Sequence, residues 1–384
     1  MEFIDLKKVF ATHPVISELN DLLGSNNPIL LKGVKGSFIP FISPTFSKKF
    51  KVQLFLMPDY ESAAYLFNDL EKIMDEQDVF FFPSSKKLSI KQTKTDHENI
   101  LLRSELLQTL RYHSNPLYIV SYPEAIAEKV MNGDEFDQKN LQLAVNDKLD
   151  LSFITEVLEE YGFTYNDFVY EPGQYAIRGS IVDVYSYSSE KPFRIDFNDN
   201  LVESIRTFDV ESQLSIEKVN KVSILPNIQE DAKNWINLFQ YINSSLLVWV
   251  NGLNYIYKFV DDFVDKVTKD ANHTIEKYSR SAEFKLFFKE KAHIEIGLTT
   301  EKANYKVVQV EQFAQPIFKK NFSMLANDLA IHNASNFKVY ILSDQQKQLD
   351  RLRSIFDEIA NPPVKFEKFF LKIGCANCST CTTL

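Results

Sequence analysis

Short apolar runs alternate with amphipathic stretches over the first 130 residues of the chain. The runs that predict buried strands are residues 29–31, 51–58, 78–83 and 117–121. The stretches with apolar residues at helical spacing are residues 5–23, 59–72, 97–112 and 124–130. Asp59 stands at the start of the second stretch, where its side chain can cap a helix. Strands that alternate with helices in this way predict an α/β fold with a parallel sheet.

The pattern changes after about residue 135. Between residues 170 and 226, short strand-like runs are separated by clusters of turn residues. Phe193, Ile195 and Phe197 alternate with Arg194 and Asp196, which predicts a half-buried strand with one polar face. We therefore expect a small antiparallel module inserted into the α/β domain or following it.

The remaining chain returns to longer elements. Residues 228–292 are predicted to be mainly helical, with one strand at 246–250. Residues 337–343 and 345–358 predict a further strand and helix. These last two elements indicate another small α/β unit.

The turn after the first apolar run has part of a phosphate-binding sequence. A working loop reads G-x-x-x-x-G-K-[ST], in which backbone N–H groups and the lysine bind phosphates and the hydroxyl binds Mg²⁺. With Gly33 in the first position, the last three positions are Phe38, Ile39 and Pro40, and proline also lacks the backbone donor. The degenerate loop would comprise Gly33, Gly36, Ser37, Phe38, Ile39 and Pro40. The sequence alone leaves two interpretations open: an NTPase scaffold without its phosphate chemistry, or an ordinary glycine-containing turn.

Length and charge limit the class of protein. A chain of 384 residues is long enough for two or three domains. The net charge of −9 argues against a dominant non-specific nucleic-acid surface. The most apolar long segment, residues 246–264, is interrupted by polar side chains and a glycine, and the first residues have no signal-peptide pattern. We expect a soluble, cytoplasmic protein with no membrane partner.

Metal and hydrolase motifs are missing from the sequence. The three cysteines, Cys375, Cys378 and Cys381, all lie within the last ten residues. This C-x-x-C-x-x-C run could hold a metal or cluster, but it has no fourth ligand nearby, and its abrupt composition favours a non-native tail at residues 374–384. The six histidines have no metal-binding spacing, and neither H-x-x-x-H nor G-x-S-x-G occurs. We predict no metal site and no catalytic residues.

Five sequence blocks resemble a known family in order and in spacing. They are Glu171-Pro-Gly-Gln-Tyr-Ala-Ile-Arg-Gly-Ser-Ile-Val-Asp-Val-Tyr185, Pro192-Phe-Arg-Ile-Asp-Phe197, Val202-Glu-Ser-Ile-Arg-Thr-Phe-Asp209, Ser212-Gln-Leu-Ser215 and Ile224-Leu-Pro226. They are similar to the N-terminal UvrB-like region of the bacterial transcription-repair coupling factors (the Mfd family). A weaker resemblance extends to about residue 370.

The resemblance implies a fold and a division into domains. It implies a UvrB-like parallel-sheet domain of the degenerate P-loop NTPase/helicase type, an inserted small β-rich α+β domain, and a further small α/β domain. The expected limits are 1–132 and 223–302 for the two segments of the UvrB-like domain, 133–222 for the inserted domain, and 303–373 for the third.

The resemblance also implies that this segment is catalytically silent. The three Asp-Glu pairs, at residues 75–76, 134–135 and 357–358, do not follow an apolar strand, as an acidic Mg²⁺ motif should. Residues 84–95, which correspond to a Tyr-rich DNA-clamping hairpin in UvrB, contain no aromatic residue. We expect no ATP hydrolysis and no cofactor here. In the family, ATP, Mg²⁺, RNA polymerase and DNA are bound by modules that would lie beyond residue 384.

The expected partner is UvrA, the damage-sensing ATPase of nucleotide excision repair. The resemblance implies this partner because the inserted domain binds UvrA both in UvrB and in the Mfd family. The resemblance carries that role onto Arg178 and Arg194, with Arg206 as a third candidate, because an arginine fork suits pairing with a partner's carboxylates. The alternative for each arginine is a structural ion pair with Asp183, Asp196 or Asp209.

Two other functions are alternatives to the adaptor role. One is a UvrB-type, ATP-dependent damaged-DNA binding protein, and the other is a plain DNA-binding module. Residues 170–213 contain four basic and eight acidic side chains, a net charge of −4 that is wrong for a surface following phosphates. A recruiting adaptor for UvrA is the function that we predict.

Overall fold

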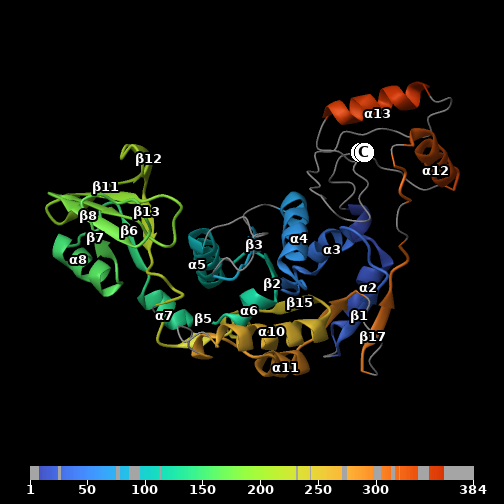
Figure 1. Cartoon of the computed structure of the whole chain (residues 1–384), viewed down its shortest axis with the longest axis horizontal. Helices are drawn as coiled ribbons and strands as arrows, with labels where there is room; N and C mark the ends of the chain where they lie inside the picture. The colour runs from blue at the N-terminus through green and yellow to red at the C-terminus, as the bar shows by residue number, and fades with distance from the viewer. Residues whose placement is uncertain are drawn as a thin grey trace.

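The computed structural model describes most of the chain. The described residues are 8–24, 27–74, 78–85, 96–112, 114–230, 232–242, 244–269, 275–297, 304–312, 316–319, 321–335 and 346–358. Within them the inserted module, the main body and two C-terminal helices follow one another along the longest axis (Figure 1).

The main body is built on a seven-stranded sheet with the order β17-β1-β16-β15-β2-β4-β3, in which every neighbouring pair is parallel. Its strands are β1 (Ile29–Lys32), β2 (Val52–Leu56), β3 (Val79–Phe81), β4 (Leu117–Ser121), β15 (Leu246–Asn251), β16 (His293–Ile296) and β17 (Lys306–Gln309). All residues of β2 and β4 are buried, as expected for strands covered on both faces. The predicted α/β fold with a parallel sheet is confirmed.

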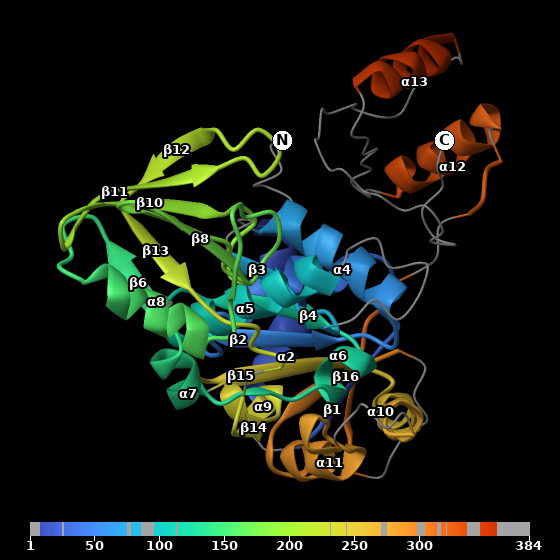
Figure 2. The same ribbon diagram turned by 60° about the vertical axis from the view of Figure 1, so that its left-hand side comes forward.

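Helices cover both faces of this sheet. On one face lie α4 (Tyr60–Ile73) and α5 (Asp96–Tyr112), and on the other α10 (Leu253–Val267) and α11 (Ser281–Glu290) (Figures 1 and 2). Asp59 caps α4 as predicted, because its carboxylate accepts a hydrogen bond from the Ser62 N–H at 2.8 Å. The shorter helices of the body are α2 (Pro14–Leu22), α3 (Phe38–Ile42), α6 (Pro123–Ala127) and α9 (Leu238–Tyr241), with 3₁₀ turns at Ser43–Phe46 and Ile275–Lys277.

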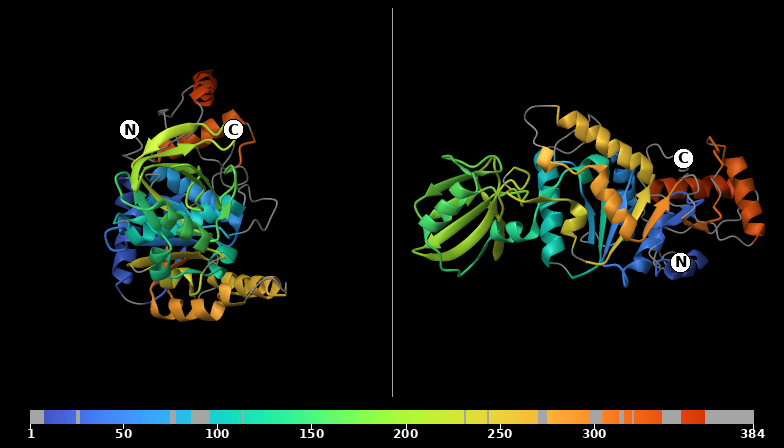
Figure 3. Two further views of the ribbon diagram at one scale, coloured as in Figure 1. Left: turned by 90° about the vertical axis from the view of Figure 1, so that its left-hand side faces the viewer. Right: turned by 90° about the horizontal axis from the view of Figure 1, so that it is seen from below.

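The inserted module is a six-stranded sheet with the order β12-β11-β10-β9-β8-β7. Its strands are β7 (Thr164–Tyr165), β8 (Gln174–Arg178), β9 (Ile181–Val184), β10 (Phe193–Asn198), β11 (Leu201–Phe208) and β12 (Ser215–Val219). All neighbours are antiparallel except β7 and β8. One face packs on α8 (Leu151–Glu160) and on the paired strands β6 (Leu141–Ala144) and β13 (Lys221–Ile224), and these elements share a separate hydrophobic core. Figure 3 shows this module beside the main body.

The chain enters the module through α7 (Gly133–Gln138) and returns beside it. On the body side, β5 (Val130–Met131) pairs with β14 (Trp235–Ile236). The Glu135 carboxylate accepts hydrogen bonds from the N–H groups of Lys233 and Asn234 at 2.8 and 3.0 Å. The buried side chain of Glu135 therefore joins α7 to the segment that leads into β14.

A polar clamp fixes α7 to α5. Arg111 forms an ion pair with Asp137 and donates through Nε to Asp137 Oδ1 at 3.3 Å. The Tyr112 hydroxyl donates to the same carboxylate at 2.7 Å. Hydrogen bonding to Arg111 lowers the pKa of Asp137.

Several predicted elements differ in extent from those observed. The helix expected over residues 5–23 contains α2, which starts at Pro14 with His13 as its N-cap; residues 5–7 lie outside the described part. The helix expected at 124–130 ends at Ala127, because the chain then forms β5. Residues 228–292 contain β14 and β15 as well as helices. The predicted strand at 337–343 and the cysteine tail lie outside the described residues.

The strands do not follow two of the expected domain limits. β13 pairs with β6 across the limit at residue 222, and β17 pairs with β1 although it lies beyond residue 302. Beyond β17, α12 (Phe322–Ala334) and α13 (Gln346–Glu358) share a small hydrophobic cluster around Phe318 and Phe356. The domain limits themselves stay a prediction.

Candidate functional site

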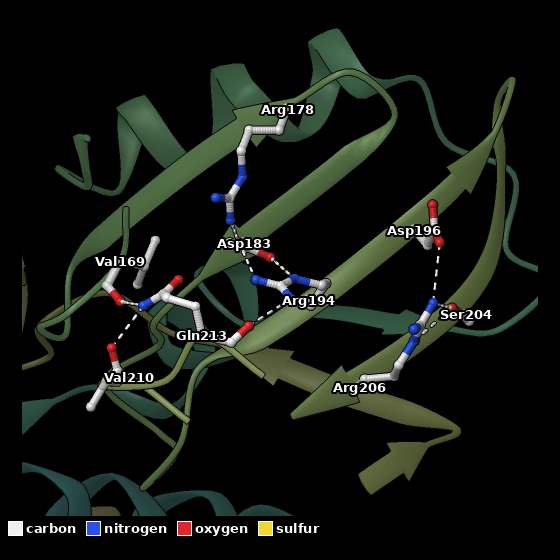
Figure 4. Close-up of polar contacts among 9 residues, drawn as sticks. All are labelled: Val169, Arg178, Asp183, Arg194, Asp196, Ser204, Arg206, Val210 and Gln213. Atoms are coloured by element: carbon white, nitrogen blue, oxygen red, sulfur yellow. Dashed lines mark hydrogen bonds and ion pairs between the residues drawn. The ribbon is translucent and has the colours of Figure 1, made fainter. Parts of the chain in front are cut away.

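The three predicted arginines lie on the polar face of the six-stranded sheet. Arg194 on β10 is directly opposite Asp183 on β9 and Arg206 on β11. Residues opposite one another on neighbouring strands point to the same face. Arg178 is two residues beyond Ala176, which opposes Asp183, so it shares this face. Figure 4 shows the four side chains on it.

Asp183 is the centre of the cluster. Its side chain is 0% exposed and accepts hydrogen bonds from Arg194 Nε at 2.7 Å and Arg194 Nη2 at 2.9 Å. Arg178 Nη2 donates to the same carboxylate. A buried carboxylate must be paired, so two guanidinium groups compensate its desolvation.

Arg194 is the more deeply held of the two arginines. Its side chain is 17% exposed, its Nη1 donates to the Gln213 carbonyl at 3.1 Å, and its guanidinium lies 4.6 Å from the centre of the Phe208 ring. Hydrogen bonding to Asp183 raises the pKa of Arg194. The structural ion pair considered from the sequence therefore exists for this residue.

Arg178 is more available to a partner. Its side chain is 40% exposed, and its guanidinium carbon lies 5.1 Å from the centre of the Phe168 ring. An arginine over an aromatic ring and beside one carboxylate keeps part of its donor fork toward the solvent.

Arg206 and Asp209 differ in their pairing. Arg206 Nη2 contacts Asp196 Oδ2 at 3.2 Å and Ser204 Oγ at 3.0 Å. Asp209, the third carboxylate considered, accepts instead from the Ser212 N–H and hydroxyl at 2.9 and 2.8 Å. These bonds lower the pKa of Asp209, so this carboxylate stabilises a turn.

Sequence reasoning missed two residues of this face. Gln213 has a positive φ of 59°, and its amide donates to the carbonyls of Val169 and Val210 at 3.3 and 2.8 Å (Figure 4). Phe168 lies under Arg178 although ten residues separate them. Neither residue carries a charge or lies in a regular element, and although Gln213 belongs to the block Ser212-Gln-Leu-Ser215, nothing in that block indicated its contacts.

The predicted phosphate loop connects β1 to α3. Gly33 has a φ of 81°, and a Cβ there would lie 2.1 Å from the carbonyl oxygen of Val310, so only glycine fits. The Lys35 N–H, a donor that a phosphate would need, is bonded to Gln312 Oε1 at 2.6 Å. All five residues of α3 are buried, including Phe38, Ile39 and Pro40.

A carboxylate stands beside the same loop. Ser37 Oγ donates to Asp69 Oδ2 of α4 at 2.6 Å. Burial raises the pKa of Asp69, although this hydrogen bond opposes the shift. The hydroxyl is therefore already bonded, and when Asp69 is ionised its negative charge repels phosphate.

The described residues contain no group of three or more His, Cys, Asp and Glu side chains that could hold a metal ion. Among the helices that the structure describes, there is none with the length and apolar character needed to cross a membrane.

The inserted module is similar to a known domain family. Residues 141–229 match the family model of the UvrB interaction domain. The UvrB interaction domain thus covers the six-stranded sheet together with α8, β6 and β13, and it contains Arg178, Arg194 and Arg206.

The wider chain is distantly similar to the transcription-repair-coupling factors. It is 26% identical to that of Bacillus subtilis over 198 residues, which are 51% of this chain and 17% of the relative. Identity to the factor of Haemophilus influenzae is 26% over 58% of this chain and 19% of the relative, and to that of Escherichia coli 26% over 44% and 15%. The chain thus matches less than a fifth of each relative's length, and the resemblance to this family is confirmed as distant homology over about half of the chain.

Proposed function

We propose that this chain is a non-catalytic, UvrB-like adaptor that recruits UvrA to stalled transcription complexes in nucleotide excision repair. The observation that carries the proposal is the match of residues 141–229 to the UvrB interaction domain. The similarity to transcription-repair-coupling factors supports the repair context and, with it, a cytoplasmic location. Contacts with RNA polymerase and DNA would be made by other parts of such a factor.

Arg178 and Arg194 are proposed to bind the partner, with Arg206 beside them. Arg178 would contact a carboxylate of UvrA directly, since its side chain is 40% exposed. Arg194 would act mainly by holding Asp183 and, through it, the position of Arg178. The separate hydrophobic core of the module supports a binding role for these arginines. The core lies on the opposite face of the sheet, so side chains of the polar face can serve binding without disturbing its packing.

The proposal includes a silent nucleotide site and no cofactor in this chain. It is supported by the bonded Lys35 N–H, the bonded Ser37 hydroxyl and the apolar α3. A phosphate would have to break both hydrogen bonds and approach buried apolar side chains. Ile39 stands at the motif position where a lysine would contact the phosphate.

The test is the affinity of the purified chain for purified UvrA, measured by isothermal titration calorimetry. We expect Arg178→Ala to weaken binding by about 1–3 kcal/mol, the range for losing a charge-assisted hydrogen bond. Arg280→Ala is the matched control, because Arg280 is 42% exposed and forms an ion pair with Asp265 in the main body.

Each outcome is informative. Normal binding by the Arg178→Ala variant would reduce this arginine to a structural role and leave the adaptor function in place. No binding by the unmutated chain would overturn the adaptor function. Arg194→Ala is compared only after circular dichroism has shown that the variant is folded.

A further inference from the structure

Two exposed aromatic side chains lie next to Arg178. Phe168 is 45% exposed and Tyr170 is 54% exposed, and the centres of their rings are 6.3 Å apart. The Arg178 guanidinium lies 5.1 Å from the centre of the Phe168 ring. Aromatic and arginine side chains are the residue types enriched in protein–protein contact sites.

The backbone between the two aromatic residues is held firmly. Val169 is fully buried in a small cluster with Phe208, and its carbonyl accepts a hydrogen bond from Gln213 at 3.3 Å. The N–H of Tyr170 donates to Gln174 Oε1 at 2.9 Å. The rings therefore project from a fixed segment, so a partner would lose little free energy in ordering it.

The arginines next to the rings outnumber the buried carboxylate that they share, and the exposed Asp167 and Glu171 flank the rings in the chain. Asp183 carries one negative charge and contacts two guanidinium groups, so the cluster has an excess of one positive charge. Asp183 is the one carboxylate that forms an ion pair with Arg178 among the described residues. The excess charge lies toward the solvent, because Arg178 is the more exposed arginine of the two.

We propose that Phe168, Tyr170 and Arg178 form one docking patch, in which the two rings are the apolar anchors of the UvrA contact. The patch fits a protein surface that presents a carboxylate next to an apolar side chain: the carboxylate pairs with Arg178 and the apolar group packs on the rings. This inference rests on the proposed function and adds to it the chemistry that the partner must offer.

The experiment measures UvrA binding by the unmutated chain and by Phe168→Ala, Tyr170→Ala and Phe153→Ala variants. Phe153 is the matched control, because it is also 45% exposed but belongs to α8, which packs on the opposite face of the sheet. We expect Phe168→Ala to weaken binding about tenfold or more, as for a central anchor, and Phe153→Ala to leave it unchanged. Tyr170→Ala should weaken binding in the same direction. Thermal unfolding of each variant checks that the module remains folded.

The outcomes separate the patch from the adaptor function. If the unmutated chain binds, Arg178→Ala weakens binding, and both Phe168→Ala and Tyr170→Ala bind normally, the patch is wrong and the adaptor function stands. An equal loss in the Phe153→Ala variant would also refute the patch, since the effect would not be confined to this face. If the unmutated chain does not bind UvrA, the adaptor function and the patch fail together.

Discussion

At the scale of single residues, Asp183 determines what the arginine face can do. A carboxylate with no exposure is stable only while its charge is compensated, and Arg194 and Arg178 share that task unequally. Arg194 contributes two hydrogen bonds from a mostly buried position, whereas Arg178 contributes one from the surface. We therefore expect Arg194 to contribute mainly to stability and Arg178 mainly to partner binding.

We predict that Arg194→Ala destabilises the protein by about 2–3 kcal/mol, because Asp183 would keep only one partner. Arg178→Ala should cost about 1 kcal/mol or less, as for a partly exposed pair. Urea unfolding of the two variants measures both values. Equal losses would contradict the division of roles, and a double variant with Asp183→Ala would measure the coupling between the paired groups.

At the scale of elements, one buried polar side chain joins two strands of the large sheet to the 3₁₀ turn at Ser43–Phe46. Gln53 on β2 accepts a hydrogen bond from Trp249 Nε1 of β15 at 2.9 Å, and its amide donates to the Ser43 carbonyl at 2.8 Å. Both side chains are buried, so neither bond can be replaced by bulk water.

Replacing Gln53 by Leu should therefore destabilise the protein by about 1–3 kcal/mol, because it leaves a buried indole N–H and a buried carbonyl unpaired. The double variant Gln53→Leu with Trp249→Phe should lose less than the sum of the two single changes, since it removes donor and acceptor together. Chemical denaturation gives the three free energies of unfolding. Strict additivity would show that the bond contributes nothing.

The β1–α3 connection leads to a second prediction at this scale. We expect millimolar ATP with Mg²⁺ to leave the thermal midpoint unchanged and to give no heat of binding by calorimetry, because Lys35 N–H and Ser37 Oγ are already bonded. A clear upward shift would support the alternative of a UvrB-type, ATP-dependent damaged-DNA binding protein.

At the scale of the whole molecule, two polar contacts contribute to the attachment of the module. The carboxylate of Glu135 joins the outgoing and returning chain, and the ion pair of Arg111 with Asp137 fixes α7 to α5. The module has its own core, so these contacts affect its orientation more than its folding.

Acid should loosen this attachment. The pKa of Asp137 is lowered in the folded protein, so its stabilising contribution is present above the unfolded value of about 3.9 and is lost as the pH falls through the lower folded value. We predict that Asp137→Asn at pH 7 increases proteolysis within residues 225–234, and that acid has the same effect on the unmutated chain. Arg280→Ala is the control at pH 7, and unchanged cleavage of the Asp137→Asn variant would contradict the clamp.

The sequence by itself determined the local structure of most elements. Continuous apolar runs predicted the buried strands β2 and β4, and the alternation at residues 193–197 predicted a strand with one polar face. The cap at Asp59 and the missing lysine of the phosphate loop were also readable, because each depends on neighbouring residues. Strand periodicity predicted the polar face for Arg194, and the family resemblance named Arg178 and Arg206 as further candidates.

The tertiary structure decided which of these residues meet. The bond between Gln53 and Trp249 joins side chains 196 positions apart, and β17 reaches β1 from beyond residue 300. Arg103 belongs to α5 and is fully buried, and it donates to the Pro83 carbonyl at 2.7 Å, although an arginine in an amphipathic helix is expected at the surface. The pairing of both Arg178 and Arg194 with Asp183 depends on the register of the strands. The contact of Arg178 with Phe168 depends on the path of the loop that carries Phe168. Periodicity determines which face a residue occupies, but only long-range packing determines its neighbour on that face.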